Sequence, residues 1–285
     1  MAAPEIRRVG VVGLGTMGAG IAQIAVQAGD DTVGREVSDE LAQRGRATIE
    51  RYLGRAVEKG RMTPDERDAA LGRLTLTTEL DDLADCELVI EAVLEELTLK
   101  REVFAELDRI CSPEAVLASN TSALSVREIA EATQWPERVV GMHFFNPAPV
   151  LPLVEIVRAP ESSDAAVRTA YEWAERVGKQ PVHCHDTPGF IVNRILIPLL
   201  NDCVRVLDEA VVRPEDMDKA MTNGAGWPIG PCALIDLIGI DVHVHASEAL
   251  HAKLREDRMA PPERLLQMRE EGTLGRKSGR GFYEY

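Results

Sequence analysis

The stretch from Ile6 to Gly20, with the sequence IRRVGVVGLGTMGAG, decides the expected fold. Its aliphatic first part, Ile6 to Val12, is typical of a buried β-strand and runs directly into a glycine-rich turn. After the glycines, apolar residues recur at helical spacing as far as Ala28, which predicts a strand, a glycine turn and a helix. Glu36 follows about 20 residues after the turn, near the end of the expected second strand, as in dinucleotide-binding units.

The glycines and the acidic residue suggest what this turn binds. Gly13 would allow the tight turn, Gly15 would let the backbone approach a pyrophosphate, and Gly18 would allow close helix packing. The helix N-terminus would face the negative charge, while the Glu36 carboxylate would accept hydrogen bonds from a ribose diol and repel a 2′-phosphate. We therefore predict NAD as the cofactor. NADP, favoured by the adjacent Arg35, and a purely structural turn are the alternatives.

Alternating strand and helix signals continue to about residue 185. Short apolar runs separated by polar helical stretches are strand candidates at 88–93, 115–118, 139–142, 153–157 and 181–184. This alternation predicts an α/β fold for residues 1–185, with a Rossmann-like, doubly wound and largely parallel sheet. The segment Asp30 to Gly34 is a poor second strand by composition.

The pattern becomes helical after His185. Thr187-Pro188 predicts an N-cap followed by proline at the first helical position. A long helix should follow, since apolar residues form a stripe at Ile191, Ile195, Leu199 and Val206. No convincing strand occurs beyond this point, so residues 186–285 are predicted to form an all-helical C-terminal domain.

Composition excludes several classes of partner. The 285 residues are 45% hydrophobic and 28% charged, as in soluble globular proteins. Lys and Arg number 32 against 47 Asp and Glu, and the net charge of −15 disfavours nucleic acid and anionic membranes. No apolar run approaches the roughly 20 residues of a membrane helix. Residues 1–8 lack a secretory pattern and the five cysteines form no CxxC pair, so a cytoplasmic location is expected.

Polar residues after the later strands suggest acid–base chemistry at the sheet edge where ligands bind. His143 could act as a general base, because imidazole has the unperturbed pKa nearest to working pH. Glu155, one strand later, could bind the other ring nitrogen, fix the tautomer and stabilise the imidazolium. The pair suits removal of a proton from an alcohol while hydride leaves the carbon. The alternative is a core histidine satisfied by backbone groups.

Two pairs of alternating histidines raise the question of a metal site. His183 and His185 flank Cys184, and His243 and His245 form the second pair. Alternate positions on a helix point apart, and no third ligand stands at zinc spacing, so we predict no metal site.

Motifs spread over essentially the whole chain resemble the L-3-hydroxyacyl-CoA dehydrogenase family, and within it the short bacterial 3-hydroxybutyryl-CoA dehydrogenase type. They are GLGTMGAGIAQ at 13–23, VIEAVLEELTLK at 89–100, LASNTSALS at 117–125, GMHFFNPAPV at 141–150, DTPGFIVNRIL at 186–196 and GRKSGRGFYEY at 275–285. The resemblance implies reversible NAD-linked oxidation of a short (S)-3-hydroxyacyl-CoA to the 3-oxoacyl-CoA, within fatty acid metabolism.

The resemblance also implies a role for individual residues. The family's catalytic histidine and its glutamate partner fall on His143 and Glu155, and its hydrogen-bond donors to the substrate oxygen fall on Ser122 and Asn193. The implied cofactor contacts are the turn residues Gly13, Leu14, Gly15, Thr16, Met17 and Gly18, then Glu36 at the adenosine ribose, and Glu95, Lys100, Asn120, Ser122, Asn146 and Lys277 at the nicotinamide half.

A basic helix face is the expected CoA site. Arg51, Arg55 and Lys59 recur every four residues, which places three cations on one face of a helix. Residues 44–61 hold six basic and two acidic side chains, a local balance of +4 in an acidic protein. The resemblance implies CoA contacts at Lys59 and at Tyr52, where the family commonly has a small polar residue. The alternative is a solvated face with salt bridges.

Three other functions remain open. The β-hydroxyacid dehydrogenases that act on free acids share the glycine turn, but they would use a lysine where this chain has Asn193, and they lack the HFFNP element. The same chemistry on an acyl-carrier-protein thioester is a second alternative, and a non-catalytic dinucleotide-binding relative is the third. Residues 229–241 resemble part of the family's dimerisation unit, so a homodimer is expected.

Overall fold

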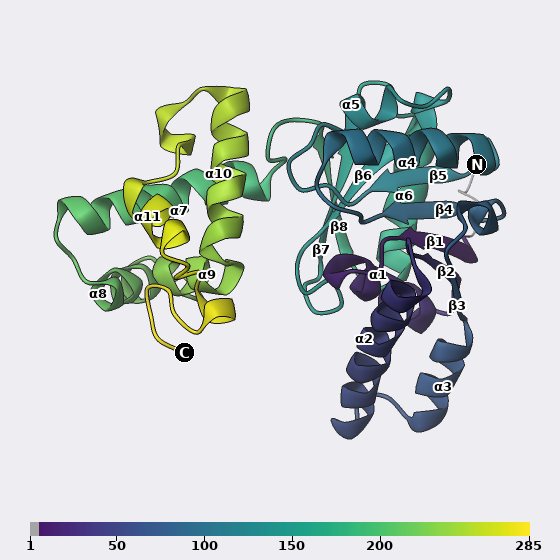
Figure 1. The fold of residues 1–285 in the computed structure, drawn as a ribbon, viewed down its shortest axis with the longest axis horizontal. Coiled ribbons are helices and arrows are strands. Elements are labelled where there is room, and N and C mark those ends of the chain that lie inside the picture. The colour runs from purple at the N-terminus through teal and green to yellow at the C-terminus, as the bar shows by residue number, and fades with distance from the viewer. Residues whose placement is uncertain (1–5) are drawn as a thin grey trace. The chain divides into compact units, whose positions relative to one another are not determined.

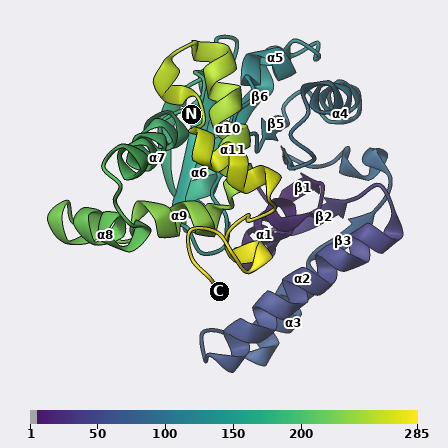
Figure 2. The ribbon, with the colours of Figure 1, turned by 60° about the vertical axis from the view of Figure 1, so that its left-hand side comes forward.

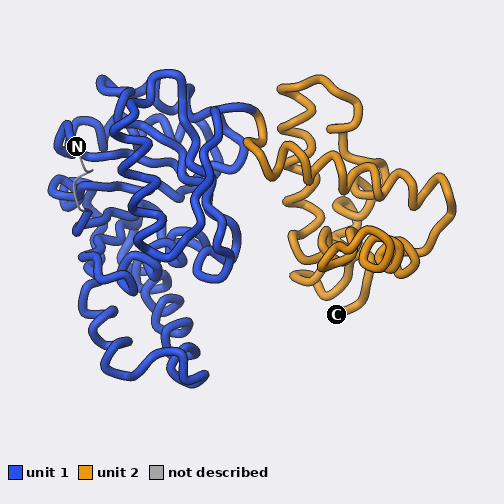
Figure 3. Tube along the Cα trace, turned by 180° about the vertical axis from the view of Figure 1, so that it is seen from behind, with its two compact units in different colours: residues 1–187 blue, residues 188–285 orange. Residues whose placement is uncertain are grey.

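The computed structural model describes residues 6–285 of a chain that divides into two compact units, residues 1–187 and residues 188–285 (Figure 3). Most of the segment 1–8, for which no secretory pattern is predicted, lies outside the described residues. Over residues 6–285, none of the helices combines the length and the apolar character that crossing a bilayer requires.

The first unit is built on an eight-stranded sheet with the order β3-β2-β1-β4-β5-β6-β7-β8 (Figure 1). Every neighbouring pair is parallel except β6 and β7. The strand order reverses between β1 and β4, and ligands bind beyond the carboxyl ends of strands at such a reversal. The predicted doubly wound, largely parallel sheet is confirmed. The strands are β1 Arg8–Val12, β2 Asp31–Arg35, β3 Leu74–Thr77, β4 Leu88–Glu91, β5 Val116–Ser119, β6 Val139–Phe144, β7 Leu153–Arg158 and β8 Gln180–His185.

Helices cover both faces of this sheet. Figure 1 shows α4 and α5 on one face and α6 on the other, and α6 shares its face with α1. The pair α2 and α3 lies side by side next to α1 (Figures 1 and 2). The helices are α1 Thr16–Gln27, α2 Asp39–Glu58, α3 Pro64–Gly72, α4 Leu97–Ile110, α5 Val126–Ala130 and α6 Asp164–Arg176.

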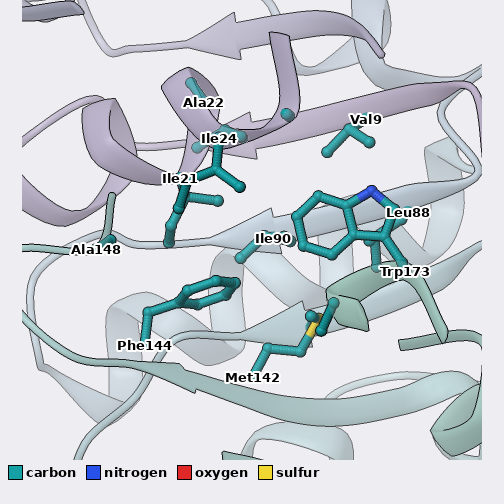
Figure 4. Close-up of a cluster of buried hydrophobic side chains, with 14 of the residues drawn as sticks. Val9, Ile21, Ala22, Ile24, Leu88, Ile90, Met142, Phe144, Ala148 and Trp173 are labelled. Atoms are coloured by element: carbon teal, nitrogen blue, oxygen red, sulfur yellow. The ribbon is translucent and has the colours of Figure 1, made fainter. Parts of the chain in front are cut away.

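The main core lies between the sheet and the helices α1 and α6. Trp173 of α6 packs edge-on against Phe144 of β6, with the ring centroids 6.4 Å apart, and Ile21 of α1 belongs to the same cluster (Figure 4). The indole Nε1 of Trp173 donates to Asp30 Oδ2 at 2.9 Å, so its polar atom is satisfied. This packing holds the start of α1 and the end of β6 on one framework.

Two details of the sheet differ from the sequence expectation. β2 forms although its composition is poor for a strand, because Thr32, Val33 and Gly34 are buried and pair with β1 and β3 on both sides. β3 has no counterpart in the prediction. It has only four residues and lies at the sheet edge, where alternation of apolar and polar residues is a weak signal.

The second unit is helical, as predicted (Figure 2). Its β-contacts within the described chain are isolated bridges near the C-terminus. Its core joins α7, α9, α10 and α11 through buried aliphatic residues such as Leu200, Ile235 and Val244. The helices are α7 Val192–Glu209, α8 Pro214–Lys219, α9 Pro231–Ile238, α10 Ile240–Leu254 and α11 Glu263–Glu270.

The predicted start of α7 is wrong. Thr187 is not its N-cap, since the helix begins at Val192. Gly189 and Phe190 have φ angles of 78° and 50°, and this left-handed backbone cannot be part of a right-handed helix. Asn193 consequently lies in the first turn of α7.

A buried polar cluster joins α7 to α10. The ring nitrogen Nε2 of His243 lies 2.8 Å from Asn201 Oδ1, and the Ser247 hydroxyl lies 3.3 Å from the same oxygen. All three residues are fully buried. Burial lowers the pKa of His243 to about 4, because a charged imidazolium would lose its solvation there.

This cluster predicts acid sensitivity of folding. Unfolded histidine titrates near pH 6.5, so as the pH falls from about 7 towards 4 only the unfolded chain gains this proton, which favours unfolding. We expect His243→Gln to remove about 2 kcal/mol of the stability lost between pH 7 and pH 5. In thermal melts across that range, the thermal midpoint of His243→Gln should fall less steeply with decreasing pH than that of the wild type. The exposed His245→Gln should follow the wild type, and parallel curves for all three proteins would refute the prediction.

Candidate active site

The glycine turn after β1 has the geometry that its sequence predicts. Gly13 has φ 88°, and a Cβ there would lie 2.9 Å from the carbonyl oxygen of Ala92. A Cβ on Gly18 would lie 1.7 Å from Gly13 O, so only glycine allows α1 to pack against the turn. A Cβ on Gly15 would meet nothing within 4 Å, which leaves space in front of the N-terminus of α1. The chain thus provides the cradle that a pyrophosphate needs.

Glu36, at the end of β2, reaches back to this turn. Its Oε1 accepts a hydrogen bond from Leu14 N at 2.6 Å and its Oε2 accepts one from Val37 N at 3.1 Å. The neighbouring Arg35 donates through Nε to Thr78 O at 3.1 Å. The carboxylate is therefore held at the glycine turn, while the nearest guanidinium is engaged with a backbone carbonyl.

His143 and Glu155 form a hydrogen-bonded pair. They face each other directly in the antiparallel register of β6 and β7, and His143 Nδ1 lies 2.6 Å from Glu155 Oε2. His143 is 5% exposed and Glu155 is fully buried. An ionised carboxylate can only accept at such a contact, which assigns the hydrogen to Nδ1 and leaves Nε2 as the nitrogen that can take up a proton. The ring of Phe145 packs at 4.4 Å from the imidazole centroid.

The ends of β5 and β6 bring the two candidate asparagines to the same sheet edge. Asn120 follows β5, and its Oδ1 accepts from Phe144 N at 3.0 Å, which ties the two strand ends together. Asn146 is exposed just beyond β6 and precedes Pro147 through a cis peptide bond. Because β1, β4, β5 and β6 run parallel, the glycine turn, Asn120 and His143 all lie at the carboxyl edge.

Glu95 organises the segment that carries Ser122. Its Oε1 accepts from Thr121 Oγ1 at 2.6 Å, from Ser122 N at 2.8 Å and from Ala123 N at 3.1 Å. Burial alone would raise the pKa of Glu95, but the Lys100 ammonium and these hydrogen bonds outweigh it and hold the pKa below its usual value. Glu95 is therefore a persistent anion that fixes the loop after β5.

Lys100 is enclosed between two carboxylates. Its Nζ lies 2.6 Å from Glu91 Oε1 and 3.3 Å from Glu95 Oε2, and its side chain is 1% exposed. Glu91 did not emerge from the sequence as a site residue. The available signal was a carboxylate at the carboxyl end of a buried strand, within the motif that also carries Glu95 and Lys100.

The basic helix face lies on α2 and its C-terminal cap. Arg51 and Arg55 are exposed on α2, and Lys59 caps the helix. Tyr52 is 39% exposed, and the Arg51 guanidinium carbon lies 5.2 Å from its ring centroid. The predicted CoA residues thus occur on one accessible stretch of helix.

Two of the predicted site residues belong to the second unit. Asn193 lies in the first turn of α7. Lys277 lies in a 3₁₀ turn over 276–278, with its Nζ 2.6 Å from Asp241 Oδ2. All the other predicted site residues are in the first unit.

The histidine pairs lie in different kinds of structure. His183 and His185 are on the strand β8, where alternate residues share a face, so the helical argument against that pair does not apply. His183 stacks on Tyr171 with the ring centroids 4.4 Å apart. Over residues 6–285, no group of three or more His, Cys, Asp or Glu residues could hold a metal ion.

Known proteins match nearly the whole of this chain. Residues 8–187 match the NAD binding domain of 3-hydroxyacyl-CoA dehydrogenase, and residues 189–285 match its C-terminal domain. A 3-hydroxybutyryl-CoA dehydrogenase of Mycobacterium tuberculosis is 48% identical over 98% of this chain and 99% of its own. The solved (S)-3-hydroxybutyryl-CoA dehydrogenase of Ralstonia eutropha has a TM-score of 0.95 at 40% identity, covering 99% of each chain. The chain therefore belongs to the 3-hydroxyacyl-CoA dehydrogenase family of NAD-linked oxidoreductases and carries both of its domains.

Proposed function

We propose that this enzyme catalyses the reversible NAD-linked oxidation of a short-chain (S)-3-hydroxyacyl-CoA, such as 3-hydroxybutyryl-CoA, to the 3-oxoacyl-CoA. The observation that carries the proposal is the buried contact of 2.6 Å between His143 and Glu155 at the carboxyl edge of the sheet. The names of full-length relatives, 3-hydroxybutyryl-CoA dehydrogenase in Mycobacterium tuberculosis and the (S)-specific enzyme in Ralstonia eutropha, support the substrate class and the stereochemistry.

His143 is the proposed general base of the oxidation. Its Nε2 takes the proton of the substrate hydroxyl, and in the reverse reaction the imidazolium returns that proton to the oxygen. Glu155 holds Nδ1–H in place and stabilises the imidazolium by its charge. NAD, when bound, accepts the hydride that leaves carbon 3 of the substrate.

Ser122 and Asn193 are proposed to donate hydrogen bonds to the substrate oxygen. Such donors stabilise the negative charge that develops there during hydride transfer. The loop that carries Ser122 is fixed by the Glu95 carboxylate, which supports a role that requires accurate placement. For Asn193, support comes from its position in the motif DTPGFIVNRIL and in the first turn of α7.

NAD is proposed in preference to NADP because of the contacts around Glu36. Its carboxylate stands at the glycine turn, where it would accept from a ribose diol and repel a 2′-phosphate. Arg35 already donates through Nε to Thr78 O, so it is less suited to bind a 2′-phosphate. We assign the residues of the glycine turn to the pyrophosphate. Assigned to the nicotinamide half are Glu95, Lys100, Asn120, Ser122, Asn146 and Lys277.

The basic face of α2 is proposed to bind the CoA phosphates. Arg55 and Lys59 supply exposed cations, and Tyr52 supplies an exposed ring beside them. Local positive charge matters here because the protein as a whole carries −15. A carrier-protein thioester is the second candidate substrate, since the same face could meet an acidic carrier.

A steady-state panel tests the function. We expect NADH-dependent reduction of acetoacetyl-CoA to have a higher kcat/KM than reduction of long 3-oxoacyl-CoA, of a carrier-bound thioester or of free acetoacetate. NADPH in parallel should be at least about tenfold poorer, which corresponds to about 1.4 kcal/mol of discrimination. If NADH is not consumed in the presence of acetoacetyl-CoA, the non-catalytic alternative is favoured. If the carrier-bound thioester turns over faster than the CoA thioester, the substrate is a carrier-bound thioester.

We also propose that the enzyme is a homodimer. Ile191, Ile195 and Val206 of the predicted stripe are 40%, 62% and 48% exposed, while the buried face of α7 carries other residues, such as Leu200 and Val204. Exposed apolar residues that gather on one helix are typical of interaction surfaces. Sedimentation velocity should give the mass of two chains.

A further inference from the structure

We propose that Glu91 is a positioning residue that holds Ser122 in its active geometry through a chain of contacts from the buried Glu91 and Lys100 to the partly buried Glu95. The inference rests on the proposed role of Ser122 as a donor to the substrate oxygen. Glu91 itself is fully buried at the end of β4 and is not assigned to substrate or cofactor.

Glu91 uses both carboxylate oxygens on hydrogen-bond donors. Oε1 accepts from Lys100 Nζ at 2.6 Å and from Val93 N at 2.7 Å, and Oε2 accepts from Ser119 Oγ at 2.7 Å. The donors come from α4, from the segment after β4 and from the end of β5. One carboxylate thus links three elements at the carboxyl edge of the sheet.

The first route from Glu91 to Ser122 passes through two charged groups. Lys100 Nζ lies between Glu91 and Glu95, at 3.3 Å from Glu95 Oε2. The other oxygen of Glu95 accepts from Ser122 N at 2.8 Å and from Ser122 Oγ at 3.3 Å. In the proposed role the hydroxyl turns its single hydrogen from this long contact to the substrate oxygen, while the bond from Ser122 N keeps the loop in place. The orientation of the Glu95 carboxylate, and with it the place of Ser122, therefore depends on where Glu91 holds the ammonium.

The second route passes through hydroxyl groups. Ser119 Oγ, which donates to Glu91, accepts from Thr121 N at 3.3 Å. Thr121 Oγ1 in turn donates to Glu95 at 2.6 Å and accepts from Leu124 N at 2.9 Å. Both routes end on the loop that carries Ser122. A displacement of Glu91 would therefore move the hydrogen-bond partners of the residues before and after Ser122.

Stability alone is a poor reason for this arrangement. Buried ion pairs are often no more stabilising than apolar residues of similar volume, because desolvation offsets the attraction. Glu91 and Lys100 are buried and the Glu95 side chain is 28% exposed, so the three groups carry a net negative charge that water solvates only in part. Such a charge is costly unless every acceptor is used. The arrangement fixes the orientation of both carboxylates, since each oxygen of Glu91 and the bonded oxygens of Glu95 have defined donors.

The central test is Glu91→Gln in a double-mutant cycle with Ser122→Ala. The glutamine amide is uncharged, so Lys100 loses its ionic partner at 2.6 Å. With the amide oxygen on Lys100 and Val93, the NH₂ faces Ser119 Oγ, which must stop donating and accept instead. We expect kcat for acetoacetyl-CoA reduction to fall by about 10- to 100-fold, a loss on the scale of small misplacements. KM for acetoacetyl-CoA should change by less than about threefold. In the Ser122→Ala background, Glu91→Gln should lower kcat by less than about threefold, because its effect passes through Ser122.

Asp108→Asn is the matched control. Asp108 and Arg138 form another buried ion pair, at 2.9 Å, with side chains 3% and 5% exposed. Its carboxylate accepts from Gln134 N and binds the guanidinium, away from the Ser122 loop. We expect a fall in the thermal midpoint comparable to that of Glu91→Gln, with kcat within about twofold of the wild type.

A milder variant covers the case in which Glu91→Gln does not fold. Ser119→Ala removes one donor of Glu91 and should lower kcat by about 3- to 10-fold, again only when Ser122 is present. Losses that multiply in the double variants, or an unchanged kcat in both single variants, would overturn the proposal while leaving the function of the enzyme intact. If Ser122→Ala itself leaves kcat unchanged, the proposed role of Ser122 is wrong, and the positioning role of Glu91, which depends on it, is wrong as well.

Discussion

His143→Gln should lower kcat for acetoacetyl-CoA reduction by about 100-fold or more, the scale of general acid–base catalysis. The glutamine amide can fill part of the space beside Glu155 but cannot take up or return a proton at working pH. NADH binding should be nearly unchanged, because the glycine turn and Glu36 are formed independently of the imidazole. Stopped-flow turnover and NADH fluorescence titration measure the two quantities separately.

Two further variants define what the His143 result means. Glu155→Gln keeps the shape of the partner but removes its charge, so kcat should fall while the thermal midpoint changes little. His183→Gln changes a histidine that stacks on Tyr171 of α6, on the opposite face of the sheet, and should keep full activity. If turnover survives His143→Gln, the assignment of the base is wrong.

Gly15→Ala should weaken NADH binding about 100-fold without unfolding the protein. The added Cβ meets no atom within 4 Å, so the fold accepts it, but it enters the space that the pyrophosphate would occupy. Loss of two charge-assisted hydrogen bonds is worth about 3 kcal/mol, which weakens the Kd for NADH about 100-fold. Isothermal titration with NADH and a thermal melt of the same sample measure both effects.

Gly18→Ala and Gly72→Ala are the controls for this experiment. A Cβ on Gly18 would lie 1.7 Å from Gly13 O, so this variant should lose both NADH affinity and thermal stability. A Cβ on Gly72, at the end of α3, meets nothing within 4 Å, and alanine there should raise stability by about 0.5–1 kcal/mol with normal activity. An unchanged Kd for NADH in Gly15→Ala would remove the glycine turn as the pyrophosphate site.

Local sequence was sufficient for the framework of this enzyme. Gly13 and Gly18 have a cause in the local backbone, since Gly13 has a φ of 88° and a Cβ on Gly18 would lie 1.7 Å from Gly13 O. Gly15 leaves open the space that a pyrophosphate would need. Apolar runs are similarly informative, since a strand buried on both faces must be aliphatic. The α/β domain and the helical C-terminal domain followed from these patterns, and the function of individual site residues came mainly through the family resemblance.

Contacts between distant residues were beyond the reach of the pattern. Thr187-Pro188 suggested an N-cap followed by proline at the first helical position, yet the left-handed Gly189 and Phe190 delay the start of α7 to Val192. The motif that marks Lys100 as a cofactor contact gave no sign that its ammonium lies between the carboxylates of Glu91 and Glu95. Periodicity reports which side of an element is buried and carries no information on which buried polar groups meet.

The sequence by itself determined the alternation of most strands and helices, the glycine turn and the candidate His143, because each depends on residues that are close in the chain; the short edge strand β3 was missed. Only the tertiary structure decided that Glu155 stands opposite His143 in an antiparallel register, and that Glu91 accepts from α4 and β5 at once. The physical reason is that strand register and buried polar pairing are settled by the simultaneous packing of several elements. Register and polar pairing therefore depend on the free energy of the whole folded unit and cannot be read from any single segment.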